Sequence, residues 1–291
     1  MTDTIERLVS EAPVVTDGAW GSLFLASGLD PGELGDAWNL THPERVEAVP
    51  RAYVEAGSRI ILTNTFRSNR ITLEAHGLAG KIREINRAGV EISRRAAAGR
   101  GASVFASIGP TGKLLVTGEI NREQLLAVYL EQVEILASAG ADAIVIETMA
   151  DLEEAKAAVE ASRKTGLPVV ACIVFDSGKN RDRTMMGVTP EQAAEGLTEA
   201  GADVVGANCG QGITGLISIC RRLRAATDRP LWIKPNAGLP ELVDGRTVYR
   251  TNPDEFAGHV PALVEAGAAF VGGCCGTTPD FIRAVARKIR A

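Results

Sequence analysis

Three of the five cysteines lie in settings where their thiols could bind a metal ion. Cys209 stands in a glycine-rich run, and Cys274 and Cys275 are adjacent, with a glycine on each side of the pair. Three thiolates and an open fourth position are typical of a catalytic zinc site, because structural zinc sites have four protein ligands. A substrate thiol at the open position would lose its proton near neutral pH, and the thiolate could displace a leaving group from an alkyl carbon. The pattern therefore predicts Zn²⁺ and alkyl transfer to a thiol.

Two other interpretations of these cysteines stay open at this point. The three thiols could be packing residues, or the adjacent pair could be a redox dithiol, although neighbouring cysteines form at best a strained disulfide. Cys172 and Cys220 have apolar or helical surroundings and are predicted to fill the core. The histidines fall in helical contexts and are predicted to be surface or capping residues rather than ligands: His42, His76 and His259.

The elements that must position these thiols follow a repeated pattern. Four times a helical stretch ends in an Ala-Gly turn that precedes a short apolar run, as a helix with a glycine cap followed by a buried parallel strand would. Strands are predicted at 13–17, 59–63, 103–108, 142–147, 168–175, 203–208, 230–235 and 268–273. Eight strands alternating with helices indicate a single-domain α/β fold, a (β/α)8 TIM barrel over residues 1–291. A doubly wound sheet is the alternative, but the first strand lacks a dinucleotide-binding glycine motif.

The carboxyl ends of the predicted strands carry polar side chains, and in such barrels the catalytic residues come from these ends. Asp17 and Glu147 lie there, well placed to hold the ammonium group of an amino-acid thiol. The alternative interpretations are an acid of a surface loop for Asp17 and a charge at a helix N-terminus for Glu147. Gly18 and neighbouring backbone N–H groups are expected to receive the substrate carboxylate. Asn64 and Thr65, which end the second strand, are predicted as further substrate contacts. The irregular segments at 109–120 and 236–251 are expected to cover the same mouth.

The composition excludes several classes of function. Charged residues make up 23% of the 291 residues, the net charge is -5, and no basic stripe is present, so nucleic acid is not an expected partner. The N-terminus lacks the basic start and apolar run of a signal peptide, and no apolar stretch is long enough to span a bilayer. The sequence thus predicts a cytoplasmic protein, in which an odd number of cysteines does not indicate a disulfide framework.

Seven stretches, in order along almost the entire chain, resemble the homocysteine S-methyltransferase family. They are Asp17-Gly18-Ala19, Thr63-Asn64-Thr65-Phe66, Gly109-Pro110-Thr111-Gly112, Glu147-Thr148, Gly206-Ala207-Asn208-Cys209, Asn236-Ala237-Gly238-Leu239-Pro240 and Gly272-Gly273-Cys274-Cys275-Gly276-Thr277-Thr278-Pro279. That family includes betaine-using enzymes and the homocysteine-binding module of cobalamin-dependent methionine synthase. The resemblance implies a zinc-bearing barrel that forms methionine. It also implies that the three cysteines hold the metal and that Asp17 and Glu147, with Gly18 nearby, hold the homocysteine amino group.

The methyl donor is less closely defined. A quaternary ammonium donor such as betaine favours an aromatic cage, yet this chain has Arg67 and Thr148 where betaine-using relatives carry tyrosines. Trp20 and Trp38 are candidates for cage walls, although core packing is expected for both. We expect a small onium donor of the betaine type. The alternatives are a methyl-corrinoid or folate-linked partner protein, and S-methylmethionine.

Two rival functions remain for the barrel as a whole. An aldolase would need a Schiff-base lysine at a strand end, and Lys234 is the candidate. A non-catalytic zinc-binding or thiol-sensing protein would have a closed site and no turnover. An open site should instead take up a thiol and release a proton.

Overall fold

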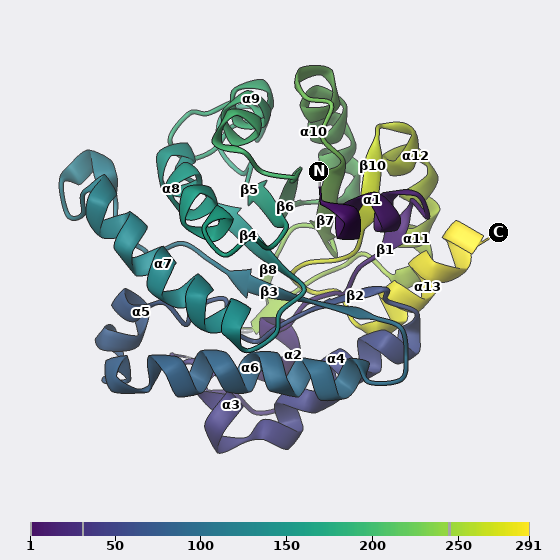
Figure 1. Ribbon diagram of the computed structural model, residues 1–291. Coiled ribbons are helices and arrows are strands. Elements are labelled where there is room, and N and C mark those ends of the chain that lie inside the picture. Colours follow the sequence, from purple (N-terminus) through teal and green to yellow (C-terminus); the bar gives the residue numbers. More distant parts are fainter. Residues whose placement is uncertain (1, 31, 244–245, 291) are drawn as a thin grey trace.

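Eight parallel strands form the wall of a barrel in this computed structural model, which describes residues 2–30, 32–243 and 246–290 (Figure 1). Their order around the wall is β1-β10-β7-β6-β5-β4-β3-β2. The strands are β1 (Val14–Val15), β2 (Ile60–Leu62), β3 (Ser103–Ile108), β4 (Ala143–Met149), β5 (Val169–Ile173), β6 (Val204–Gly212), β7 (Leu231–Asn236) and β10 (Ala268–Val271). Each overlaps a predicted strand, which confirms the (β/α)8 barrel. Met1 and Ala291, the ends of the predicted domain, lie outside the described residues.

The seam between β1 and β2 closes the wall with few contacts. The backbone N–H of Arg59, just before β2, donates to the carbonyl of Val15 at 2.8 Å. The carboxylate of Asp17 then takes the place of a backbone acceptor, because its Oδ2 receives the N–H of Leu62 at 2.9 Å. A side chain that follows β1 therefore fastens the neighbouring strand.

Helices surround the strands on the outside of the barrel (Figure 1). They are α1 (Asp3–Val9), α2 (Gly21–Ala26), α3 (Trp38–Thr41), α4 (Pro43–Ala56), α5 (Arg70–Ala75), α6 (Ile82–Ala97), α7 (Arg122–Ser138), α8 (Leu152–Arg163), α9 (Pro190–Ala200), α10 (Ile213–Ala226), α11 (Pro253–Gly258), α12 (Val260–Glu265) and α13 (Pro279–Arg290), with short 3-10 turns at 35–37, 79–81 and 115–117. Gly57 and Gly201 end α4 and α9 in the left-handed conformation, as the repeated Ala-Gly pattern predicts. None of the described helices is long and apolar enough to cross a bilayer.

The buried side chains form an inner and an outer layer. The inner layer fills the barrel and includes Phe105, Trp232 and Phe270, whose rings are stacked or tilted against one another. Ile5 and Leu8 of α1 join this layer, so α1 plugs the amino-terminal end of the barrel. The outer layer lies between the strands and the surrounding helices.

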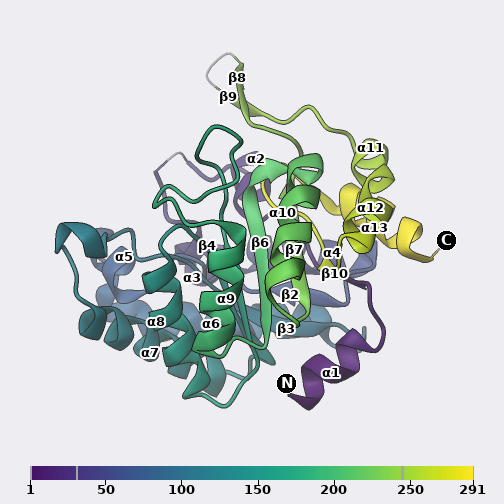
Figure 2. The same cartoon turned by 90° about the horizontal axis from the view of Figure 1, so that it is seen from above.

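The opposite end of the barrel carries the long loops, and Figure 2 shows the hairpin of β8 (Glu241–Val243) and β9 (Arg246–Val248) projecting there, away from α1. The expectation of an irregular segment at 236–251 is wrong at its centre, because these two short strands pair antiparallel. Residues 244–245 lie outside the described residues. At 109–120 the segment is irregular apart from one 3-10 turn, as predicted.

Candidate metal centre and substrate cavity

The three cysteines meet at the carboxyl ends of the strands. Cys209 lies in β6 and the pair Cys274–Cys275 follows β10, and the three sulfur atoms all lie within 4.8 Å of one another. The Sγ atoms of Cys209 and Cys275 are 3.8 Å apart. Two sulfurs bound to one tetrahedral zinc ion at about 2.3 Å would be separated by about 3.8 Å. The spacing of this pair therefore suits a tetrahedral metal ion.

Unusual backbone conformations aim the sulfurs at one point. Cys209 has a φ of 60°, in a region that non-glycine residues rarely adopt, and it lies where the pairing of β6 with β7 shifts register. On the other side Gly276, with a φ of 80°, ends the cysteine pair. A Cβ atom on Gly276 would lie 2.3 Å from the Tyr249 ring, so a side chain there has no room.

The three cysteines change one another's pKa through their mutual contacts. Hydrogen bonds from Cys274 and then Cys275 lower the pKa of Cys209 to about 3. The contact with Cys209 in turn raises the pKa of Cys274 and that of Cys275. One thiolate is therefore readily formed within the group, and a metal cation would stabilise the other two. By contrast, Cys172 and Cys220 are fully buried in the core, as predicted.

Asn236, at the end of β7, is a neighbour of this cluster that the sequence analysis did not select. Its side-chain amide helps to lower the pKa of Cys209. Its buried Oδ1 has no hydrogen-bond partner among the described residues. A buried carbonyl oxygen without a partner beside three thiols is an arrangement that a metal ion would satisfy. The cluster fits a metal on this ground as well as on its sulfur spacing.

A cavity of about 360 Å³ opens directly onto the cysteines. Its walls are built by residues of β2, β3, β4, β6 and β7 and by the segments that follow β1, β2 and β10. The residues that border it include Gly18, Trp20, Phe24, Asp30, Asn64, Phe66, Arg67, Glu147, Cys209, Lys234, Cys274 and Cys275. The cavity therefore joins the metal candidate to several of the predicted substrate contacts.

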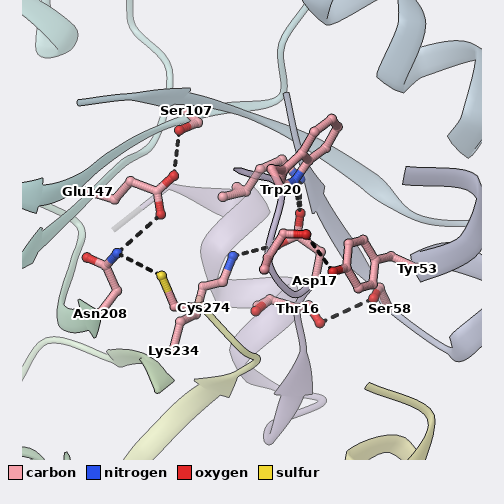
Figure 3. A network of polar contacts seen from close by, with 12 residues as sticks. Thr16, Asp17, Trp20, Tyr53, Ser58, Ser107, Glu147, Asn208, Lys234 and Cys274 are labelled. Carbon is pink, nitrogen blue, oxygen red and sulfur yellow. Dashed lines mark hydrogen bonds and ion pairs between the residues drawn. The ribbon is translucent and has the colours of Figure 1, made fainter. Parts of the chain in front are cut away.

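Glu147 is a buried carboxylate on the wall of this cavity. Ser107 Oγ donates to its Oε1 at 2.5 Å, and Asn208 Nδ2 lies 3.5 Å from its Oε2 (Figure 3). Burial raises the pKa of Glu147, and the charge of Lys234 and the Ser107 hydrogen bond only partly oppose this effect. A buried carboxylate of this kind favours a cationic ligand, because the ligand charge offsets the cost of desolvation.

Asp17 is fully buried, and within the described chain it is not among the residues that border the cavity. Its Oδ1 accepts from Lys234 Nζ at 2.5 Å, and its Oδ2 accepts from Trp20 Nε1 at 2.9 Å as well as from Leu62 N (Figure 3). The structure thus places Asp17 behind Lys234 and Trp20. Its predicted contact with the substrate stays a prediction.

The other predicted substrate residues differ in their exposure to the cavity. Gly18 borders it and is sterically constrained, since a Cβ there would lie 2.7 Å from the hydroxyl of Tyr53. Asn64 borders it too, but its amide is bonded to Asn39 and to Gly35 O. Thr65 is fully buried and donates to Ser107 O at 2.7 Å, which places it beside the cavity wall.

The two tryptophans that were candidates for walls of the donor site differ in their position relative to the cavity. Trp20 borders the cavity, whereas Trp38 is 1% exposed and packs against Phe24 and His42. The sequence analysis missed Asn208 as a positioning residue and treated Lys234 as an aldolase candidate. The sequence could have indicated both residues only by their position, since each lies in the carboxyl-terminal part of a strand next to a motif already recognised.

Comparisons with known proteins identify the family of this chain. Residues 14–289 match the family model for homocysteine S-methyltransferase. The chain is 32% identical to the methionine synthase of Mycobacterium leprae and 33% identical to that of Mycobacterium tuberculosis, in each case over 99% of this chain and 25% of the relative. It therefore spans about a quarter of the length of these relatives.

The fold is similar to that of the homocysteine methyltransferase MmuM from Escherichia coli in its metallated form. The TM-score is 0.82 at 24% sequence identity, with 99% of this chain and 100% of that chain covered. The family match spans nearly every residue from β1 to the end of α13, including all three cysteines. This chain is thus a member of the homocysteine S-methyltransferase family.

Proposed function

We propose that this chain transfers a methyl group from a small onium donor to the thiol of homocysteine, giving methionine, and that its metal is zinc. The observation that carries the proposal is the convergence of Cys209, Cys274 and Cys275 at the edge of a cavity that also holds the Glu147 carboxylate. Residues 1–291 then act as one homocysteine-binding unit.

The cysteines fit zinc because thiolates are its preferred soft ligands. When bound, zinc would supply the positive charge that keeps the homocysteine thiol deprotonated near neutral pH. The protein's own residues do the remaining work. Trp20 and Phe66 border the cavity with apolar surface, which excludes water from the sulfur nucleophile.

Glu147 would bind the homocysteine ammonium group. Its Oε1 is held by Ser107 and its Oε2 lies near Asn208, so the carboxylate is oriented before the substrate arrives. Asp17 would act from behind the wall, through the cation it holds at Lys234. The same ion pair leaves Lys234 charged, which opposes the Schiff-base chemistry of an aldolase.

A small onium donor suits the outer half of the cavity. Trp20 and Phe66 offer aromatic surface to a cation, and Asp30 adds a negative charge at the mouth. Arg67 also borders the mouth with an exposed guanidinium group. Betaine and S-methylmethionine both carry a carboxylate that such a guanidinium could bind.

The direct test is an assay of the zinc-loaded protein with homocysteine and, separately, betaine, S-methylmethionine and methylcobalamin. We expect methionine to form with a small onium donor. Absence of methionine with every donor, from a protein that retains zinc and binds homocysteine, would reject the proposed activity. Release of one proton on homocysteine binding would separate an open site from a closed structural one.

A protein-borne methyl-corrinoid donor is a second candidate, favoured by one surface feature. Every large apolar side chain that is strongly exposed in the described chain lies in a segment after β1, β3, β5 or β7, at the end where the cavity opens. They are Leu25, Val116, Met185, Met186, Leu239, Leu242 and Val243. Apolar surface around a mouth is typical of a docking site. The similarity to methionine synthases points in the same direction.

The substitution Leu242→Asp distinguishes a small onium donor from a protein-borne methyl-corrinoid donor. Leu242 is 79% exposed on β8, so the change leaves the core intact. It should weaken methyl transfer from a corrinoid protein and leave transfer from betaine unchanged. Equal activity with a corrinoid protein before and after the change would count against docking at this rim.

A further inference from the structure

A second buried carboxylate, that of Asp36, borders the cavity and has no role in the transfer proposed above. Asp36 lies in the 3-10 turn at 35–37 and is 5% exposed. Its Oδ1 accepts from Arg67 N at 2.8 Å and from Ser68 Oγ at 2.7 Å, so it fastens the segment after β2 to the segment after α2. One oxygen of this carboxylate therefore has a structural task.

The other oxygen of Asp36 is left for a ligand. Apart from the backbone N–H of Asp36 itself, no further donor in the described part of the chain reaches Oδ2. Burial raises the pKa of Asp36, and the Ser68 hydrogen bond, the Arg67 N–H and the Arg67 charge only partly oppose this effect. A carboxylate with such a desolvation cost gains more from a cationic ligand than a carboxylate in water does.

Aromatic rings lie on the same part of the cavity wall. Gly35, the residue before Asp36, packs on Phe24, since a Cβ there would lie 3.3 Å from the ring. The Phe24 ring packs in turn edge-on against Trp20, with 5.9 Å between the ring centroids, and both residues border the cavity. A carboxylate beside aromatic surface suits an onium ion, which has no N–H or S–H to donate and is attracted by charge and by ring faces.

The other acids that border the cavity are less suited to this task. Asp30 and Glu33 are exposed, so water and salt screen their charges. The Glu33 carboxylate is also occupied, since its Oε1 accepts from Trp38 Nε1 at 2.9 Å. Glu147 is assigned above to the homocysteine ammonium group. Among the described residues, Asp36 is therefore the buried acid of the cavity wall that remains for the donor.

We infer that the Asp36 carboxylate binds the onium centre of the methyl donor, beside Phe24 and Trp20. This inference rests on the proposed function and names the group that selects a cationic donor. In the transfer, the thiolate sulfur forms a bond to the methyl carbon, and the electron pair of the broken bond stays on the donor nitrogen or sulfur. Both charges are thereby neutralised, so Asp36 attracts the donor more strongly than the transition state. It therefore serves donor binding and not acceleration of the chemical step.

Two pairs of ligands that differ in charge test the inference by calorimetry on the zinc-loaded protein. Betaine is compared with 3,3-dimethylbutyrate, and S-methylmethionine with 2-amino-5-methylhexanoate, in which carbon replaces the onium atom. Homoserine is added to occupy the homocysteine site without a reactive thiol. At least one onium ligand should bind about 10- to 100-fold more tightly than its carbon isostere. Equal affinity within both pairs, or no binding of either onium ligand, would overturn the inference without any variant.

Asp36→Asn separates this role from a structural one, because the asparagine oxygen can still accept from Arg67 N and Ser68 Oγ. The change should abolish the preference for the onium ligand and raise the donor KM by a similar factor without lowering kcat. Ser68→Ala is the matched control: it removes one of the two loop contacts and keeps the charge, so the preference should remain. A preference retained in Asp36→Asn, or lost equally in Ser68→Ala, would show that Asp36 acts only in the loop. Absence of methionine from the unchanged protein with every donor would instead reject the proposed function.

Discussion

The side-chain amide of Asn208 makes two hydrogen bonds to Thr148. Asn208 Oδ1 accepts from the backbone N–H of Thr148 at 2.8 Å, and Asn208 Nδ2 donates to the Thr148 hydroxyl at 2.7 Å. Thr148 has a φ of 62°, a conformation that is costly for a β-branched residue. Because Thr148 directly follows Glu147, these two hydrogen bonds fix the backbone that orients the Glu147 carboxylate toward the cavity.

Asn208→Ala should therefore weaken homocysteine binding although Asn208 is not expected to touch the substrate. Loss of both contacts leaves buried polar groups unpaired, which costs about 1–3 kcal/mol, and part of this should appear as weaker binding. Asn208→Asp keeps the acceptor for Thr148 N and should give an intermediate dissociation constant in calorimetry. Unchanged affinity in the alanine variant would show that Glu147 is oriented by other contacts.

Glu147→Gln should separate binding from stability. The change removes the buried charge but keeps the size of the side chain, so homocysteine affinity should fall about 10- to 100-fold. Folding raises the pKa of Glu147, so its charged form opposes folding at neutral pH. The midpoint of thermal unfolding at pH 7 should consequently stay the same or rise. A lower midpoint would mean that the carboxylate supports the fold.

Metal retention should depend on the cluster and not on cysteines in general. Cys274→Ala removes one of three converging sulfurs and should abolish zinc retention after dialysis, measured by elemental analysis. Cys220→Ala is the matched control, because Cys220 is a buried cysteine of α10 outside the cluster. Full zinc content in the Cys274→Ala protein would contradict the assignment of the ligands.

The turn after the cysteine pair should tolerate only glycine. Gly276 and Gly112 have similar φ values of 80° and 77°, but only at Gly276 would a Cβ collide, with the Tyr249 ring. Alanine at Gly112 should cost about 1 kcal/mol of backbone strain. Alanine at Gly276 should cost more than that and reduce zinc affinity as well. Equal free energies of unfolding for the two variants would show that Tyr249 moves aside freely.

One ion pair predicts a pH-dependent contribution to stability. Two hydrogen bonds from Arg222, at 2.6 and 2.7 Å, lower the pKa of Glu191 to about 2. A lowered pKa stabilises the fold above the usual value of 4.5 and loses this effect as the pH falls toward 2. Glu191→Gln should therefore cost about 0.5–1 kcal/mol at pH 7, given the exposure of the pair, and nothing near pH 2. Glu195→Gln, on the same helix, is the control for chemical denaturation.

The fold could be predicted because its signals are local. Glycine caps such as Gly201 and short apolar runs such as 144–146 fix where helices end and strands begin, so all eight barrel strands were located. The β8–β9 hairpin was missed because its strands are short and exposed, which leaves no buried alternation to detect. The Asp-Gly pair at 244–245 is a common hairpin turn signal that could have revealed it.

The site was predicted in part, for a physical reason. The three cysteines converge as expected, because strand ends of one barrel open on the same face. The direction of each side chain at a strand end depends on register and on local bulges, which single residues do not disclose. Asp17 lies behind Lys234 and Thr65 lies beside the cavity wall, so their predicted contacts with the substrate stay predictions. Asn236 and Asn208 gain their roles only from neighbours distant in sequence.

The carboxylate of Asp17, which accepts a hydrogen bond from Lys234, also holds the shortest strand of the barrel wall to its neighbour. β1 is two residues long, and Asp17 Oδ2 completes its junction with β2 by holding Leu62 N. Trp20 borders the cavity and its Nε1 donates to the same Oδ2, so ligand binding in the cavity and opening of the wall at this junction become linked equilibria. Deuterium uptake at the Leu62 amide should slow when homocysteine is added, which would make the enzyme's own scaffold a reporter of its substrate.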